Sequence, residues 1–165
     1  MPRSLMFFAL ALVLVGCDLG EQSTLSTTPP SMLRGVLTLT DTLGQETTTF
    51  RVGENFDLSY VISNSTAREI TYHKGNSGPA ASFKILQGDS VVATSTDGYL
   101  FLAVALTAHL IPGDSIHVAW RAPNTAARTP KLVLAPGAYR AVVSFGGFDE
   151  ATVEANAPIS FTVTP

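Results

Sequence analysis

The chain has 165 residues, of which 45% are hydrophobic and 14% charged, and its formal net charge is −3. Its 13 Gly and 10 Pro are typical of a turn-rich, β-rich globular protein, and the length fits one domain. The weakly acidic balance and the lack of a Lys/Arg cluster argue against a nucleic-acid partner and against electrostatic binding to anionic lipid.

Residues 1–16 have the pattern of a secretory signal sequence. Arg3 supplies a short basic segment, and residues 5–15 form an unbroken apolar run. This run is too short for a permanent membrane-spanning helix, which needs about 20 apolar residues. We therefore expect export and removal of residues 1–16, which leaves a formal charge of −4.

The signal pattern ends in a short motif: Leu14, Val15 and Gly16 directly precede Cys17, the only cysteine of the chain. The motif resembles the lipobox of bacterial lipoproteins, which implies a diacylglycerol on the Cys17 thiol and an acylated N-terminal amine. Several acyl chains anchor a protein stably, where a single chain is marginal. The expected location is the bacterial cell envelope, outside the cytoplasm, on a membrane and leaflet that the sequence leaves open.

Residues 17–32 are expected to form a tether between this anchor and the folded domain. The stretch 22–30 is rich in Ser, Thr and Pro and has no apolar periodicity. Such a segment cannot bury enough surface to offset the entropy of ordering it, so we expect it to be flexible. The folded domain is expected at 33–165, and without a second cysteine it has no disulfide.

The domain sequence predicts strands and turns, with no amphipathic helix of three turns. Apolar residues alternate with polar ones in 56–62, as expected for a strand that lies on a core. The run 99–106 fits either a buried strand or one to two helical turns, and its setting among strands favours a strand. Frequent turn signals favour a two-sheet antiparallel sandwich. Strands are expected at 36–40, 47–52, 56–62, 68–72, 83–86, 90–95, 99–106, 115–120, 138–145 and 158–163.

Two Pro-Gly pairs, Pro112-Gly113 and Pro136-Gly137, each precede an alternating strand. Pro at the second and Gly at the third position predict a type II turn, because that turn needs a positive φ at its third residue. Trp120, at the end of the first of these strands, is expected in the core. Gly88-Asp89 predicts a two-residue hairpin turn.

The residue pattern does not indicate an enzyme. His73, His109 and His117 have no metal-binding spacing, and no serine lies in a nucleophile motif. We therefore expect no catalytic residue, no metal and no cofactor. Asn64-Ser65-Thr66 matches a glycosylation sequon, but a tight turn is the better interpretation.

The longest segment expected to be exposed is 121–131, between two strong strands. Loops of this length are often functional, so the segment is a candidate for binding a protein partner. Its candidate contact residues are Arg121, Pro123, Asn124, Arg128, Pro130 and Lys131.

The order of turn and core residues also resembles a known family. Across about residues 47–165 it is similar to the BsuPI-type intracellular proteinase inhibitor domain, which implies an immunoglobulin-like antiparallel β-sandwich and an inhibitory role. The residues that carry the likeness are Gly53-Glu54, Phe56, Leu58, Tyr60, Ile62, Asn64, Phe83, Ile85, Gly88-Asp89, Val91, Leu110, Pro112-Gly113-Asp114, Trp120, Leu134, Pro136-Gly137 and Tyr139.

These patterns together predict a lipid-anchored envelope protein that binds another protein, either a protease or an envelope component. The resemblance favours a proteinase inhibitor. The alternative is a structural or adhesive envelope module with the same fold and no protease target, because sandwich folds serve both roles.

Overall fold

A computed structural model describes residues 33–145, 153 and 156–165. Cys17 and the preceding Leu14, Val15 and Gly16 lie outside the described residues. Among the described residues, no helix is long and apolar enough to cross a membrane. The strands are β1 (Leu33–Thr40), β2 (Thr49–Arg51), β3 (Phe56–Asn64), β4 (Ile70–Lys74), β5 (Ala81–Gln87), β6 (Ser90–Thr94), β7 (Leu106–Leu110), β8 (Ser115–Ala122), β9 (Gly137–Phe145) and β10 (Ile159–Thr164).

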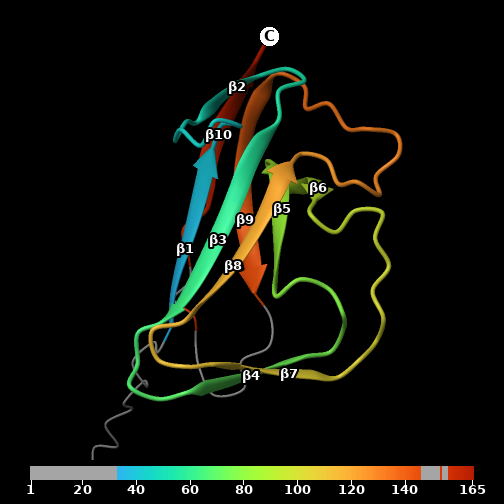
Figure 1. The fold of residues 1–165 in the computed structure, drawn as a ribbon. Helices are drawn as coiled ribbons and strands as arrows, with labels where there is room; N and C mark the ends of the chain where they lie inside the picture. Colours follow the sequence, from blue (N-terminus) through green and yellow to red (C-terminus); the bar gives the residue numbers. More distant parts are fainter. Residues whose placement is uncertain (1–32, 146–152, 154–155) are drawn as a thin grey trace, which may run out of the picture.

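The strands form two facing sheets and one small sheet (Figure 1). One sheet has the order β1-β3-β8, and the other has the order β2-β10-β9-β5-β6. Pairing is antiparallel except between β2 and β10, which run parallel. The pair β4-β7 lies across one end of the two sheets (Figure 1). The fold is an all-β sandwich, as predicted.

The core lies between the two sheets and is rich in aromatic side chains. Every second residue of β3 is buried, so the alternation that predicted this strand is confirmed. Phe50, Phe56 and Phe161 pack with ring centroids 4.6 to 5.9 Å apart. Trp120 is 6% exposed, and its ring stacks on Phe83 of the opposite sheet at 6.3 Å. The core position predicted for Trp120 is therefore confirmed.

The two Pro-Gly pairs differ in conformation. Gly113 has φ +87°, and the Asp114 N–H closes the turn on the carbonyl three residues earlier at 3.0 Å, as predicted. Gly137 has φ +156° and is the first residue of β9, so the type II turn predicted there is wrong. The Tyr139 hydroxyl holds the chain at this point instead, because it donates to the Ala135 carbonyl at 2.8 Å.

The hairpin predicted at Gly88-Asp89 is confirmed. β5 ends at Gln87 and β6 begins at Ser90, so two residues connect the strands. Gly88 has φ +60° at the first turn position, which is the requirement of a type II′ turn.

The strand predicted at 99–106 is wrong for all but its last residue. Residues 99–105 belong to no strand, and Leu106 begins β7, which pairs with β4. β6 ends at Thr94 in a turn that the Asp97 side chain closes, and this turn leads the chain out of the sheet. The apolar run therefore lies at the surface, where Leu100 is 100% exposed.

Asn64 links three segments at the end of the sandwich. Its Oδ1 accepts hydrogen bonds from the Thr66 N–H at 3.0 Å and from the Thr66 hydroxyl at 2.7 Å. Its Nδ2 donates to the Arg68 carbonyl at 2.9 Å and to the Leu110 carbonyl at 2.7 Å. The side chain is 1% exposed, and its nitrogen is occupied by both bonds. The structure therefore agrees with the turn interpretation of Asn64-Ser65-Thr66.

Candidate functional site

The candidate binding segment is the connection between β8 and β9, residues 123–136, which we call the β8–β9 loop. It extends from the side of the sandwich as the orange loop in Figure 1. Arg121 and Ala122 belong to β8 itself. The expectation that 121–131 is exposed throughout is wrong, since Ala122, Pro123 and Thr125 are buried against the domain.

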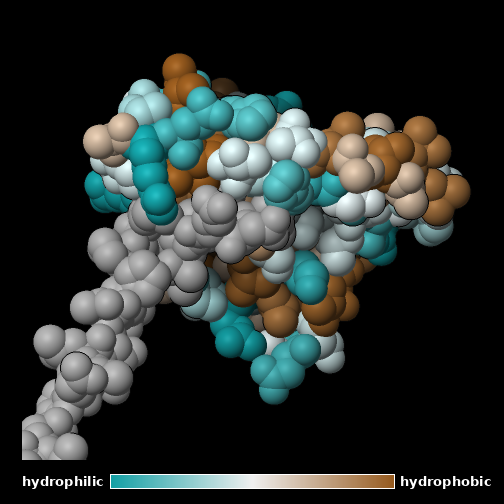
Figure 2. All heavy atoms as spheres, turned by 90° about the horizontal axis from the view of Figure 1, so that it is seen from below, coloured by the Kyte–Doolittle hydropathy of each residue, from teal (hydrophilic) through white to brown (hydrophobic). Residues whose placement is uncertain are grey.

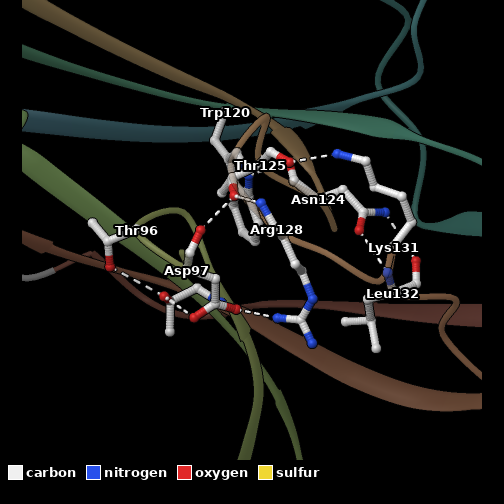
Figure 3. Close-up of polar contacts among 9 residues, drawn as sticks. Thr96, Asp97, Trp120, Asn124, Thr125, Arg128, Lys131 and Leu132 are labelled. Atoms are coloured by element: carbon white, nitrogen blue, oxygen red, sulfur yellow. Dashed lines mark hydrogen bonds and ion pairs between the residues drawn. The ribbon is translucent and has the colours of Figure 1, made fainter. Parts of the chain in front are cut away.

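The first part of the β8–β9 loop is fixed to its second part by Asn124. Its Nδ2 donates to the Leu132 carbonyl at 2.9 Å, and its Oδ1 accepts from the Leu132 N–H at 2.6 Å (Figure 3). Its backbone carbonyl accepts a hydrogen bond of 2.9 Å from the indole Nε1–H of Trp120. Asn124 thus joins both parts of the loop to a core side chain.

Thr125 connects the loop to a second loop that follows β6. Its hydroxyl donates to the Asp97 carbonyl and also accepts the Arg128 N–H at 3.1 Å. Its own carbonyl accepts a 2.7 Å hydrogen bond from the Lys131 ammonium group. The hydroxyl of this buried threonine therefore bonds both to the β8–β9 loop and to the loop after β6.

Asp97 and Arg128 form an ion pair at the same place (Figure 3). The side chains are 29% and 26% exposed, so the pair is only partly solvated. Burial acts to raise the pKa of Asp97. Hydrogen bonds from the Thr94 N–H and hydroxyl, together with the Arg128 charge, outweigh burial and hold this pKa below its usual value. The carboxylate is therefore a stable ionic support for the loop.

Arg121 lies on β8 with its side chain on the outer face of the three-stranded sheet. Its guanidinium donates to both carboxylate oxygens of Asp57 on β3, each at 2.9 Å. The hydrogen bonds to Asp57, together with the negative charge of that carboxylate, raise the pKa of Arg121. This is a surface ion pair across neighbouring strands.

The tip of the loop is small and uncharged. Ala126, Ala127, Thr129 and Pro130 are exposed, and none has a charged side chain. The side chains of Arg128 and Lys131 both bond to groups of the domain. Of the six predicted contact residues, Pro130 lies at the tip, Pro123 is buried, and the other four make internal hydrogen bonds or ion pairs.

Sequence reasoning missed two residues that position the loop, Asp97 and Gly98. Gly98 has φ +79°, and a Cβ atom there would lie 2.7 Å from the Ala127 carbonyl oxygen. Only glycine allows this close approach without strain. The Asp-Gly pair was itself a turn signal, but nothing in the sequence indicated that the turn would meet the β8–β9 loop.

The three histidines are exposed, each on a different strand: His73 and His109 lie on the paired strands β4 and β7, and His117 lies on β8. His109 is bonded through Nδ1 both to Glu69 at 2.7 Å and to the Thr71 hydroxyl at 3.3 Å. His73 and His117 bond to the hydroxyls of Thr107 and Ser59. Within the described part of the chain, no three His, Cys, Asp or Glu side chains are grouped as metal ligands.

Two hollows lie beside the candidate residues, one under the β8–β9 loop and one beside β4. One of about 270 Å³ lies under the loop and is lined by Tyr99, Trp120, Asn124 and Thr125 among others. A larger one of about 510 Å³ lies beside β4 and includes His73, Lys74 and Phe101. No carboxylate lines either hollow among the described residues, so neither presents an acid beside a base.

No family model matches the chain, and no curated protein matches it. Among solved structures it is similar to a β-glucosidase from Listeria innocua in complex with glucose, at 12% identity and a TM-score of 0.39, over 79% of this chain and 16% of that one. It is also similar to the alkylpurine DNA glycosylase AlkC of Pseudomonas fluorescens bound to DNA, at 11% identity and a TM-score of 0.40, over 82% of this chain and 31% of that one.

A β-glucosidase of Erythrobacter marinus shows the same degree of likeness, with 10% identity and a TM-score of 0.39. The chain covers 15 to 31% of the length of these three proteins. Likeness of this degree identifies neither a family nor an activity. The resemblance to the BsuPI-type domain therefore stays a prediction from the sequence.

Proposed function

We propose that the protein is a non-catalytic binding module of the bacterial cell envelope, anchored by lipid at Cys17, which binds another protein through the tip of the β8–β9 loop. The observation that carries the binding role is a small exposed tip on a base that is fixed by hydrogen bonds. The anchor rests on the likeness of Leu14, Val15, Gly16 and Cys17 to a lipobox, and these residues lie outside the described part of the chain.

A fixed loop is suited to binding because a partner does not have to order it. Each rotamer-rich side chain or loop that becomes ordered on association costs about 0.5–1.5 kcal/mol. Asn124, Thr125 and Asp97 already hold the backbone on either side of the tip. The partner would therefore meet a surface that changes little on binding.

The charges of the loop indicate which partners it suits. Arg128 is paired with Asp97, and the exposed Lys131 donates to the Thr125 carbonyl, so both basic side chains already have partners within the domain. If the module inhibits a protease, as the BsuPI resemblance implies, the tip suits an enzyme with a small or apolar specificity pocket. A trypsin-like pocket, which contains a carboxylate, would find no free basic residue here.

The non-catalytic part of the proposal is supported by the surroundings of His109. In a catalytic triad the histidine uses one ring nitrogen for the nucleophile and the other for the acid. Here Thr71 and Glu69 share the same nitrogen, Nδ1. Both the histidine and the glutamate side chains are more than half exposed. This geometry does not activate the threonine hydroxyl.

The test is a titration of the purified chain against subtilisin-like, elastase-like and trypsin-like proteases, with residual activity and cleavage of the chain followed together. Stoichiometric inhibition of the first two classes, with the chain intact, is expected for an inhibitor. Thr129→Arg at the tip should weaken inhibition at least tenfold. Thr42→Arg is the matched control, because Thr42 is exposed in the turn after β1.

Each outcome separates the candidate roles. Inhibition that Thr129→Arg and Thr42→Arg affect equally would contradict the role of the tip. Absence of inhibition with all three classes would exclude the inhibitor and leave a structural or adhesive module. Capture of envelope proteins by chemical cross-linking from position 129, compared with position 42, would then test whether the tip binds any protein.

A further inference from the structure

The segment between β6 and β7 exposes an unusual set of apolar side chains, and we call residues 99–106 the apolar segment. The exposed fractions are 100% for Leu100, 73% for Leu102, 44% for Leu106, 43% for Tyr99 and 37% for Phe101. Single exposed leucines are ordinary, but a contiguous group of this kind usually marks a surface that meets another apolar phase. Figure 2 views the molecule from below and shows hydrophobic atoms gathered at the right, which is the side on which the segment runs in Figure 1.

The apolar segment is held in this exposed position. Leu102 exchanges two hydrogen bonds with Ser77: its N–H donates to the Ser77 hydroxyl at 3.0 Å, and its carbonyl accepts the Ser77 N–H at 2.9 Å. The rings of Tyr99 and Phe101 stack at 6.1 Å. Because the backbone is tied in the middle, the leucines on either side cannot turn inward without breaking these bonds.

The chemistry of the segment fits lipid better than protein. The stretch 98–113 contains no Asp, Glu, Lys or Arg. The nearest charged residue before it is Asp97, which is neutralised by Arg128. Protein interfaces place a polar rim around an apolar centre, and charges there set the orientation of the partner. Leucine, phenylalanine and tyrosine without charges are typical of residues that enter the boundary between headgroups and acyl chains.

The apolar segment runs along the side of the sandwich and leads to the end of the domain where the described chain begins (Figure 1). Leu33 is the first described residue, and it pairs with Asn64. Asn64 in turn bonds to the carbonyl of Leu110, the last residue of β7. β7 begins where the apolar segment ends, so the small β4-β7 sheet and the entry of the chain share one end of the sandwich (Figure 1).

We propose that Leu100, Phe101 and Leu102 insert into the interface of the bilayer that carries the lipid anchor, and so orient the sandwich on the membrane. This inference rests on the proposed anchor at Cys17. Residues 18–32 span at most about 50 Å when extended, so an anchored domain stays within that distance of the lipid. If this tether is flexible, as its sequence predicts, it gives an effective concentration in the mM range, at which even a weak insertion site is occupied.

Insertion would also set the position of the β8–β9 loop. Asp97 lies two positions before the first residue of the apolar segment, and it bonds to Thr125 and Arg128 of that loop. The base of the β8–β9 loop is therefore joined through Asp97 to the segment that carries the inserted residues. The membrane would hold it at a constant height and on a constant side of the domain.

The experiment uses the full chain, expressed in a bacterial host and reconstituted into phosphatidylethanolamine–phosphatidylglycerol vesicles. Leu102→Cys introduces a thiol that can be labelled with the environment-sensitive dye NBD, because Cys17 is the only native cysteine and is expected to carry lipid. Leu43→Cys is the matched control. Leu43 is 83% exposed in the turn after β1, at the end of β1 opposite to Leu33.

We expect NBD at position 102 to shift to the blue, to gain intensity several-fold and to be quenched by brominated acyl chains. The same dye at position 43 should remain water-like. Salt should not change either signal, since the contact is apolar. A water-like signal at position 102 in vesicle-bound chain, or equal signals at 102 and 43, would overturn the inference and leave the segment as a surface for a protein.

Failure of the anchor is seen separately, in the wild-type chain. A lipid thioether at Cys17 leaves no thiol, so wild-type chain should take up no NBD and should float with the vesicles. Labelling of Cys17 together with loss of flotation would overturn the proposed anchor, and the inference with it. Flotation without dye insertion would overturn the inference alone.

Discussion

Asn124→Ala tests whether the β8–β9 loop is fixed by its base. The change removes two hydrogen bonds between the Asn124 side chain and the Leu132 backbone, which measure 2.6 and 2.9 Å. A side-chain hydrogen bond of this kind contributes about 1 kcal/mol, so the loop should lose about 2 kcal/mol against opening. The bond from the Trp120 indole uses the Asn124 backbone carbonyl and remains available in the variant.

The direct assay is hydrogen exchange at the Leu132 N–H. A loss of about 2 kcal/mol corresponds to roughly 30-fold faster exchange through local opening. Amides in β3, whose exchange requires unfolding of the core, should change much less. Asn76→Ala is the matched control, because Asn76 accepts one 2.8 Å hydrogen bond, from the Gly78 N–H.

Two results would refute this account of the loop. Exchange at Leu132 that is unchanged in Asn124→Ala would show that the loop is held by other contacts. Equal acceleration at Leu132 and throughout β3 would show that the variant weakens the whole domain. If local exchange rises as expected, inhibition or capture by the tip should weaken with it, because the ordering cost then falls on the binding step.

Three further predictions concern stability and use urea or thermal denaturation. The folded state lowers the pKa of Asp97, so its carboxylate stabilises the fold above the unfolded pKa near 3.9. This stabilisation is lost as the pH falls through the folded pKa. The difference in unfolding free energy between wild type and Asp97→Asn should therefore close on acidification. Asn64→Ala should cost about 2–4 kcal/mol, because a buried carbonyl loses its donor; a cost under about 0.5 kcal/mol would contradict its linking role. Gly98→Ala should cost about 1–3 kcal/mol, and more than Gly44→Ala, which has a similar φ and open space around its Cβ position.

The alternation of apolar and polar residues was enough to predict the strands that face the core. In 56–62 and 138–145 this pattern located β3 and β9 to within two residues at either end. Trp120 was placed correctly for the same reason. These predictions succeed because a strand with one buried face must repeat with a period of two.

Composition could not show where the apolar segment lies. An uninterrupted apolar run has no period, so it does not separate a buried strand from an exposed loop. The position of this run in the fold depends on two other features. Asp97 closes the turn after β6, and β4 pairs with Leu106–Leu110, which leaves 99–105 outside any strand.

The candidate loop was located from its length, but its base depends on contacts between residues more than twenty positions apart, such as Asp97 and Arg128. No local pattern contains that information.

The single tryptophan gives the molecule a built-in optical reporter. Trp120 lies on β8, its ring stacks on Phe83 of the other sheet, and its Nε1–H bonds to the carbonyl of Asn124. Excitation at the red edge of protein absorbance therefore samples one indole that touches both layers and the β8–β9 loop. Separation of the sheets would change its packing and shift the emission, whereas release of the loop alone would leave the stack and free the indole N–H to water. Lifetime and solvent-quenching measurements on the unlabelled chain can thus distinguish the two events.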